Sequence, residues 1–436
     1  MPKLRKKTVA RKTNYVPYVR GFHPPTRSEA VEASIFTENH LPYTEKALKE
    51  ALERREKEDL GVIEELKPHS SFKPIPKCTS IDDWLAQYCE TGQSFSCFIE
   101  TCPWLSKRKC KGIRQKFVST GTTLQNRYPE GSIYLLPIGD FNNDSSPEFI
   151  DLVQYSQIFF GIPVKTLPEA KLIIKNNGDI FCRPHGSSRE YLIKSRTKGN
   201  RYQLNIYTLL DFVREVAPDD ALATIALTMS DIYEAKPDLF VAGMAAGLAR
   251  VAVFSFYRYN PKLEFSPEFW YEVKEKKTGL SEAEIRKLFL QRSCRLLVHE
   301  IGHLLGVDHC IFYECCMNGS GHLQEDFRQP MFLCPVDLHK LSYMCGFDIL
   351  QRYGDLRHFF DKFGLINEVN WIDKRLRDIE NSKMKSMKPM TSLKLLMTRK
   401  NGQYTIEDNK IAQHSTSIET SIHNKKGCDN SNKPTE

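Results

Sequence analysis

The stretch HEIGHLLGVDHC, residues 299–310, decides how the rest of the chain is interpreted. It holds three histidines, one glutamate and one glycine within twelve residues. His299 and His303 are four residues apart, so on a helix their imidazoles lie on one face, one turn apart. Gly306 can end that helix in a left-handed conformation, which lets His309 return towards the same point. The pattern therefore predicts that three imidazoles converge.

This convergence predicts a catalytic zinc site. Three imidazoles can hold one Zn²⁺ at about 2.0–2.1 Å per nitrogen and leave a fourth position open for water. Glu300 directly follows the first histidine and is predicted to be the general base, acting on a zinc-bound water that attacks a carbonyl carbon. The alternative is an ordinary helix with buried histidines, which the full HExxHxxGxxH spacing disfavours.

The surrounding sequence predicts a long helix that follows a mixed α/β layer. Ser281 and Glu284 form a capping-box pattern, and the helix should continue from there to Gly306. Residues 201–218 are open to either interpretation, as a strand or the start of a helix. The other elements predicted from apolar patterning are strands at 131–139, within 164–175 and at 249–259, helices at 147–161 and 219–233, and one or two helices after Cys345.

Composition and charge narrow the classes of protein. Hydrophobic residues make up 41% of the 436, which is a globular composition, and the net charge of +8 is concentrated near the two ends. We therefore predict no nucleic-acid groove. No apolar segment is long enough for a membrane span, and no secretory leader is recognisable, so we expect the cytoplasm and/or nucleus and not secretion. In such a compartment the thirteen cysteines should be thiols or metal ligands.

Three regions are predicted along the chain. Residues 1–77 form an N-terminal extension with a basic disordered start and a charged helix at 45–65. Residues 78–375 form the catalytic domain, and residues 376–436 form a disordered basic tail. Five cysteines lie between 78 and 110, but without a CxxC pair they do not predict a metal cluster.

The motif resembles that of a known family. HExxHxxGxxH is a metzincin signature, and its continuation CIFYECCM, residues 310–317, resembles that of the archaemetzincins. The resemblance is strongest over residues 133–353. It implies a zincin-like (metzincin) metalloprotease fold of the α+β or mixed α/β class, with a twisted mixed sheet and an active-site helix. It also implies that Met317 is the methionine of a Met-turn beneath the zinc.

The resemblance also implies a second, structural zinc held by four cysteines. Cys310, Cys315 and Cys334 fall at three of the four positions, but Asp337 stands where the fourth cysteine should close a CxxC pair. A carboxylate can ligate zinc, so Asp337 can complete the set. Two spare thiols are the alternatives: Cys316 and Cys345.

These features predict a zinc-dependent peptidase that hydrolyses peptide bonds in peptide or protein substrates, as an amino- or endopeptidase. The alternative is a zinc-stabilised module that binds peptides or proteins with little or no cleavage. A weaker alternative is a metal-dependent hydrolase of another amide. The resemblance extends to residues 240–259, where the family has a strand that edges the cleft and where an extended peptide could pair. The oligomeric state is left open.

Overall fold

A computed structural model describes residues 25–34, 66–67, 69–78, 83–141, 146–198, 201–236, 239–263, 279–386, 399–400 and 403–404. The basic start, the predicted helix at 45–65 and most of the predicted tail lie outside these residues. The chain divides into two units, Met1–Ser386 and Met387–Glu436. In the second unit the structure describes the antiparallel strands β12 (Arg399–Lys400) and β13 (Gln403–Tyr404). The boundaries predicted after 77 and 375 stay predictions, although helix α12 (Ile366–Ser386) crosses the second one.

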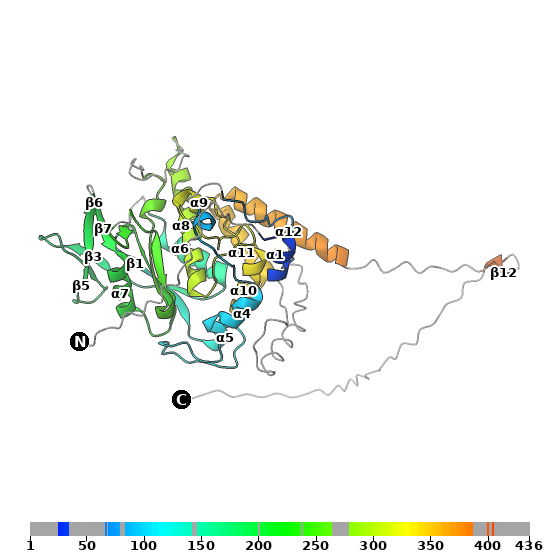
Figure 1. Cartoon of the computed structure of the whole chain (residues 1–436), viewed down its shortest axis with the longest axis horizontal. Coiled ribbons are helices and arrows are strands. Elements are labelled where there is room, and N and C mark those ends of the chain that lie inside the picture. Colours follow the sequence, from blue (N-terminus) through cyan, green and yellow to red (C-terminus); the bar gives the residue numbers. More distant parts are fainter. Residues whose placement is uncertain are drawn as a thin grey trace, which may run out of the picture. The chain divides into compact units, whose positions relative to one another are not determined.

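A five-stranded mixed sheet forms the centre of the first unit, with the strand order β10-β11-β8-β1-β2 (Figure 1). Neighbouring strands run parallel, except that β10, at one edge, is antiparallel to β11. The predicted mixed α/β class is therefore confirmed. The strands of this sheet are β1 (Ser132–Ile138), β2 (Val164–Thr166), β8 (Ala221–Thr228), β10 (Gly243–Ala246) and β11 (Val251–Ser255).

Helices cover both faces of this sheet (Figure 1). The three helices are α6 (Phe149–Phe160), α7 (Ile206–Val216) and α8 (Glu282–Leu304). Strand β1 shows the two faces, because Ile133 and Leu135 pack in the core beneath α6 and α8, whereas Leu136 and Ile138 pack in the core beneath α7. Every residue of β1 and of β8 is buried. A parallel strand between two helical layers needs apolar residues on both faces, which explains these continuous apolar runs.

The prediction of a helix at Asp219–Tyr233 is wrong. The structure has strand β8 there, followed by β9 (Asp231–Tyr233). The segment Ala221–Thr228 is apolar at nearly every position, and a short run of this kind fits a buried helix and a doubly covered strand equally well. The acidic residues before it belong to a turn, in which the Ala221 amide donates to the Pro218 carbonyl at 3.1 Å, and do not cap a helix.

Two small three-stranded sheets are formed by strands that lie between β2 and β10 in the sequence. Their strand orders are β3-β4-β5 and β6-β7-β9. The segment 164–175 contains two strands, β2 and β3, and the segment that begins at 201 is β7 followed directly by α7. The strands not yet delimited are β3 (Lys171–Ile174), β4 (Ile180–Arg183), β5 (Tyr191–Ile193), β6 (Ser195–Lys198) and β7 (Arg201–Asn205).

Helix α8 begins and ends as predicted. Ser281 Oγ accepts a hydrogen bond from the Glu284 amide at 3.3 Å, and the Glu284 carboxylate accepts one from the Ser281 amide at 2.9 Å. Together these contacts form the capping box. The helix ends at Leu304, and Gly306 has a φ of +87°. The strand predicted at 131–139 and the helix at 147–161 are confirmed as β1 and α6, whereas the strand predicted at 249–259 is confirmed only over β11, because 3₁₀ turns take up both of its ends.

The remaining helices lie in the half of the first unit that carries α8 (Figure 1), where several of them pack on one another. Among the described residues two helices follow Cys345, where one or two were predicted. Helix α10 contacts both α1 and α4, so early and late segments share one core. The bounds are α1 (Arg27–Ser34), α3 (Trp84–Gln87), α4 (Phe95–Thr101), α5 (Leu124–Arg127), α9 (Leu323–Arg328), α10 (Pro335–Cys345) and α11 (Ile349–Lys362); 3₁₀ turns lie at Pro103–Leu105, Gly247–Ala249 and Tyr257–Tyr259.

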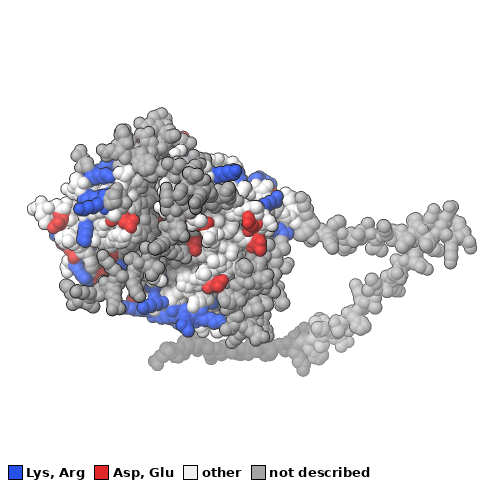
Figure 2. Space-filling view, viewed as in Figure 1, with Lys and Arg blue, Asp and Glu red and all other residues white. Residues whose placement is uncertain are grey.

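Charges of both signs are spread over the face drawn in Figure 2, and Lys and Arg gather along its lower edge. Within the described ranges, no helix is both long and apolar enough to cross a bilayer.

A buried ion pair anchors the start of β9 to the segment after β11. Asp231 accepts hydrogen bonds from Arg258 Nη2 at 2.6 Å and Nε at 3.0 Å, and both side chains are less than 5% exposed. Removing one partner leaves the other charge buried, so we expect Asp231→Ala to lower the free energy of unfolding by about 3–5 kcal/mol. Urea unfolding checks this value. Asp219→Ala is the matched control, because its ion pair with Arg114 is exposed and should contribute less than about 1 kcal/mol.

Candidate metal centre

Three imidazoles converge where α8 ends. His299 and His303 lie on the last two turns of the helix, and His309 returns from the loop after Gly306. The Nε2 atoms of His299 and His303 are 3.0 Å apart, and one ring nitrogen from each histidine lies within 4.8 Å of the other two. Ligand nitrogens around a tetrahedral zinc lie about 3.3 Å apart, given bonds of about 2.0–2.1 Å. The three rings therefore fit one zinc ion, as the spacing predicted.

The other nitrogen of each ring, Nδ1, already has a partner. Two of these partners are backbone carbonyls and the third is a carboxylate. The contacts are His299 to the Cys316 carbonyl (2.7 Å), His303 to the Val307 carbonyl (2.8 Å) and His309 to Glu90 Oε1 (2.8 Å). Carbonyl and carboxylate oxygens only accept, so we assign the hydrogen to Nδ1 in each ring. Each Nε2 then presents a lone pair, the form in which imidazole binds a metal.

Burial sets the charge states in this cluster. It lowers the pKa of His299 to about 3, with a further contribution from His309, and it lowers the pKa of His303 well below its usual range. Both rings are therefore neutral near pH 7. Burial, together with the charge of Asp326, raises the pKa of Glu300 to about 8. A carboxylate that holds a proton this readily is suited to proton transfer.

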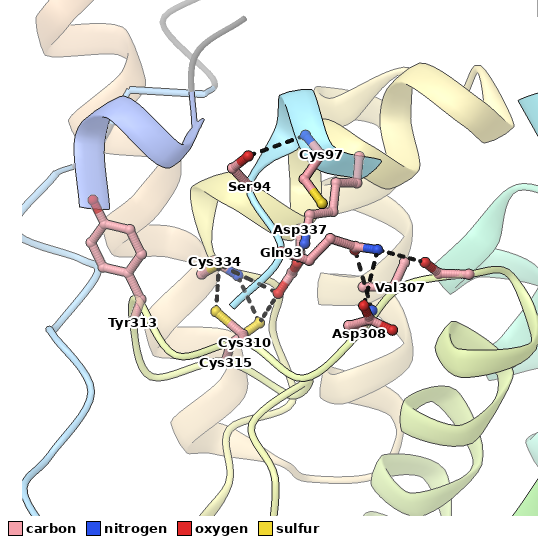
Figure 3. Close-up of polar contacts among 12 residues, drawn as sticks. Gln93, Ser94, Cys97, Val307, Asp308, Cys310, Tyr313, Cys315, Cys334 and Asp337 are labelled. Carbon is pink, nitrogen blue, oxygen red and sulfur yellow. Dashed lines mark hydrogen bonds and ion pairs between the residues drawn. The ribbon is translucent and has the colours of Figure 1, made fainter. Parts of the chain in front are cut away.

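The segment 83–93 supplies contacts that the sequence analysis did not predict. Glu90 Oε1 accepts from His309 and also from the indole Nε1–H of Trp84, at 2.7 Å. Gln93 binds the loop before His309, because its Nε2 donates to the Gly306 carbonyl at 3.1 Å and its Oε1 accepts from the Asp308 amide at 3.2 Å (Figure 3). Glu90 and His309 are 219 positions apart, so no local spacing could have linked them.

The pKa of Glu90 reflects the same contacts. Burial by itself would raise it, but the hydrogen bond and charge of His309 and the hydrogen bond from Trp84 hold it below the usual value. Glu90 is therefore an ionised carboxylate at neutral pH.

Met317 packs against α8 at the level of the histidines. It is fully buried, and a Cβ placed on Gly302 would lie 2.7 Å from its Sδ. The Met317 carbonyl accepts from the Cys310 amide at 2.8 Å, which closes the loop between these residues. The absence of a side chain at Gly302 is what gives the methionine its space.

A second group of metal-binding side chains lies beside this loop. Cys310, Cys315, Cys334 and Asp337 are all buried, and their ligand atoms lie within 4.8 Å of one another (Figure 3). Cys310 Sγ and Cys334 Sγ are 3.6 Å apart, close to the spacing of about 3.8 Å expected for two sulfurs on a tetrahedral zinc. Asp337 Oδ2 lies 3.2 Å from Cys315 Sγ and 3.6 Å from Cys334 Sγ. The structure thus brings together the four residues named for the second site.

Asp337 directs one oxygen to the sulfurs and the other to a lysine. Its Oδ1 accepts from Lys340 Nζ at 2.7 Å, and the two side chains are at most 1% exposed. Burial raises the pKa of Asp337 to about 6 although Lys340 opposes the shift. Burial would lower the pKa of Lys340, but Asp337 raises it above the usual value. The charged lysine would therefore offset part of the negative charge that three thiolates and a carboxylate would place around a divalent cation bound there.

The remaining described cysteines do not take part in either group of metal-binding side chains. Within the described residues, Cys316, Cys345 and the five cysteines between 78 and 110 belong to no group of converging ligand atoms. None of the twelve described cysteines forms a disulfide.

A third group of polar side chains converges at Asp83, His322 and Glu325. There, His322 Nδ1 accepts from the Glu325 amide at 3.2 Å and its Nε2 faces Asp83 at 3.0 Å. His322 is thus the N-cap of α9, and the Glu325 carboxylate accepts from the amides of Gly321 at 2.6 Å and Trp84 at 2.9 Å.

Comparisons with known proteins give the class of this chain. Residues 276–342 match the family model of Peptidase family M54. Human archaemetzincin-2 is 32% identical over 306 residues, which cover 66% of this chain and 75% of that protein. Mouse archaemetzincin-2 is 31% identical over 364 residues, 76% of this chain and 87% of that protein. Human archaemetzincin-1 is 31% identical over 257 residues, 55% of this chain and 48% of that protein.

The chain belongs to the archaemetzincin family of peptidases, as the motif predicted. A crystal structure of archaemetzincin from Methanopyrus kandleri aligns with 48% of this chain and 94% of that chain, at 23% identity and a TM-score of 0.31.

Gly306 should be required for the position of His309. Alanine at a φ of +87° is strained by about 1–2 kcal/mol, and its Cβ would also lie 3.1 Å from Cys102 Sγ. We expect Gly306→Ala to lower both the free energy of unfolding and the metal bound per chain. Gly178→Ala is the matched control: its φ is +86° and nothing lies within 4 Å, so it should share the strain but leave metal uptake unchanged. Equal metal content in the two variants would contradict this role.

The cysteine group should release protons when it takes up zinc. Burial raises the pKa of Cys310 and Cys315 to about 12 and that of Cys334 well above its usual range, so all three are thiols at pH 7 in the metal-free protein. Zinc binds thiolates, so loading should release about three protons, and affinity should fall as the pH falls. Zinc titration of chelator-stripped protein in weakly buffered indicator solution measures the release. Cys334→Ser should reduce it, whereas His303→Ala should not.

Proposed function

We propose that this protein is a zinc-dependent peptidase in which His299, His303 and His309 bind the zinc and Glu300 is the general base. Membership of a peptidase family supports hydrolysis of peptide bonds. The observation that carries the zinc site is the convergence of three imidazoles, each with its Nδ1 bound to an acceptor oxygen and one ring nitrogen within 4.8 Å of the other two.

The residues divide the chemistry between them. A bound zinc supplies a Lewis acid, which polarises a carbonyl oxygen and makes water more acidic. Glu300 directly follows the first ligand on α8, so the helix fixes its position within the turns that carry His299 and His303. It receives the proton of the attacking water and then delivers it to the leaving amine. Its raised pKa, caused first by burial, favours this second transfer.

We propose a second, structural zinc at Cys310, Cys315, Cys334 and Asp337. The spacing of the ligand atoms, their burial and the compensating charge of Lys340 support it. Asp337 would be a monodentate ligand, because its other oxygen is bound to the lysine. Met317 would be the methionine of a Met-turn, which its packing against Gly302 supports.

The proposed substrate is an extended peptide or a segment of a protein. Among the described strands of the central sheet, β10 pairs with β11 on one side and ends the sheet on the other. An extended chain can add to such an edge through backbone hydrogen bonds. Action on internal or amino-terminal bonds, the absence of nucleic-acid and membrane partners, and location in the cytoplasm and/or nucleus stay predictions from the sequence.

Replacing the general base tests the proposal. We expect Glu300→Gln to lower the rate of peptide cleavage by about 10²–10⁴-fold while zinc content stays unchanged, because glutamine cannot accept the proton. Digestion of a peptide library with wild-type and variant protein measures this, and the positions of the cuts distinguish an aminopeptidase from an endopeptidase.

Glu282→Gln is the matched control, because Glu282 lies at the other end of α8 and is 60% exposed beside Lys262. It should cleave as wild type does. Unchanged cleavage by Glu300→Gln would refute its role as the base. Peptide binding without cleavage in wild type would support the alternative, a zinc-stabilised binding module.

A further inference from the structure

Glu90 contacts the third histidine from a distant part of the chain. It lies between α3 and α4, and its Oε1 accepts the Nδ1 hydrogen of His309 at 2.8 Å. The two side chains are about one-fifth exposed, at 21% and 19%. A charged acceptor in a partly buried position makes a stronger hydrogen bond than a neutral one. The Glu90 carboxylate therefore holds the His309 ring more firmly than a neutral acceptor would.

His309 differs from the other two histidines in what holds it. His299 and His303 are fixed by α8, and their Nδ1 atoms bind backbone carbonyls. His309 lies on a loop, so its ring needs a side-chain partner to fix its rotation. A carboxylate on Nδ1 also makes the opposite nitrogen more basic, which strengthens it as a metal ligand.

Trp84 holds Glu90 in place. Its indole donates to the same oxygen, Oε1, at 2.7 Å, and its ring stands edge-on to His309 with the ring centres 5.0 Å apart. The Trp84 amide in turn donates to Glu325 Oε2 at 2.9 Å. Gly319 leaves room for the indole, since a Cβ there would lie 2.3 Å from its Cδ1. The carboxylate is thus positioned before any metal binds.

We propose that Glu90 is a positioning residue for His309: its carboxylate fixes the tautomer and orientation of the ring and strengthens it as a metal ligand. This inference rests on the proposed zinc site. It assigns a role in that site to a segment that lies far outside residues 276–342, which match the peptidase family model.

Zinc affinity of the full-length protein tests the inference. Zinc alone is titrated into chelator-stripped protein against a competing indicator, and the loss caused by His303→Ala identifies the histidine site. We expect Glu90→Ala to weaken this site by about 10–100-fold. Glu90→Gln keeps an accepting oxygen but loses the charge, so it should give a smaller loss. Glu314→Gln is the matched control, because Glu314 is also a partly exposed acid but pairs with Lys73 instead of an imidazole.

Cobalt provides a second readout that a general loss of stability would not produce. With Co²⁺ in place of zinc, Glu90→Gln should shift the ligand-field bands of the histidine site and leave the thiolate charge-transfer bands of the cysteine site unchanged. Wild-type zinc affinity together with an unchanged cobalt spectrum in Glu90→Gln would overturn the inference. If the His303→Ala variant binds as much zinc as the wild-type protein, the proposed zinc site itself is wrong. That outcome is distinct from a failure of the inference about Glu90.

Discussion

The candidate centre depends on one constraint: each of three imidazoles must be fixed at Nδ1 so that its Nε2 faces the others. The helix alone cannot do this, because it supplies two ring positions but no partner for either Nδ1. The partners come from the loop that follows, through the carbonyls of Cys316 and Val307, and from the segment before α4, through Glu90. The reactive geometry is thus a property of the loop as much as of α8.

The same loop connects the two groups of ligands. Cys310 follows His309 directly, and the Cys316 carbonyl that holds His299 follows Cys315. Any cation bound by the cysteines and Asp337 would therefore fix the loop at both ends, next to the atoms that orient the histidines. Met317, which closes the loop through its carbonyl, fills the space beside Gly302. Displacing one of these contacts would disturb both groups.

Local sequence rules gave the histidine spacing, the capping box at Ser281 and the left-handed turn at Gly306, because each depends on residues within one or two helical turns. They failed for β8, since a strand covered on both faces has no alternation to distinguish it from a buried helix. They also could not find Glu90 or Gln93, whose partners in the loop lie more than two hundred positions away. The family resemblance supplied what spacing could not, namely the grouping of Asp337 with three cysteines.

The contacts of residues 83–93 limit how far the chain can be shortened from its N-terminal side. A fragment trimmed to the part that shares the peptidase signature would contain all three histidines, yet it would lack the carboxylate and the amide that hold their loop. Its third imidazole would be free to rotate, and the carbonyl of Gly306 would lose its side-chain donor. The smallest fragment that keeps these contacts therefore begins well before the first strand of the central sheet.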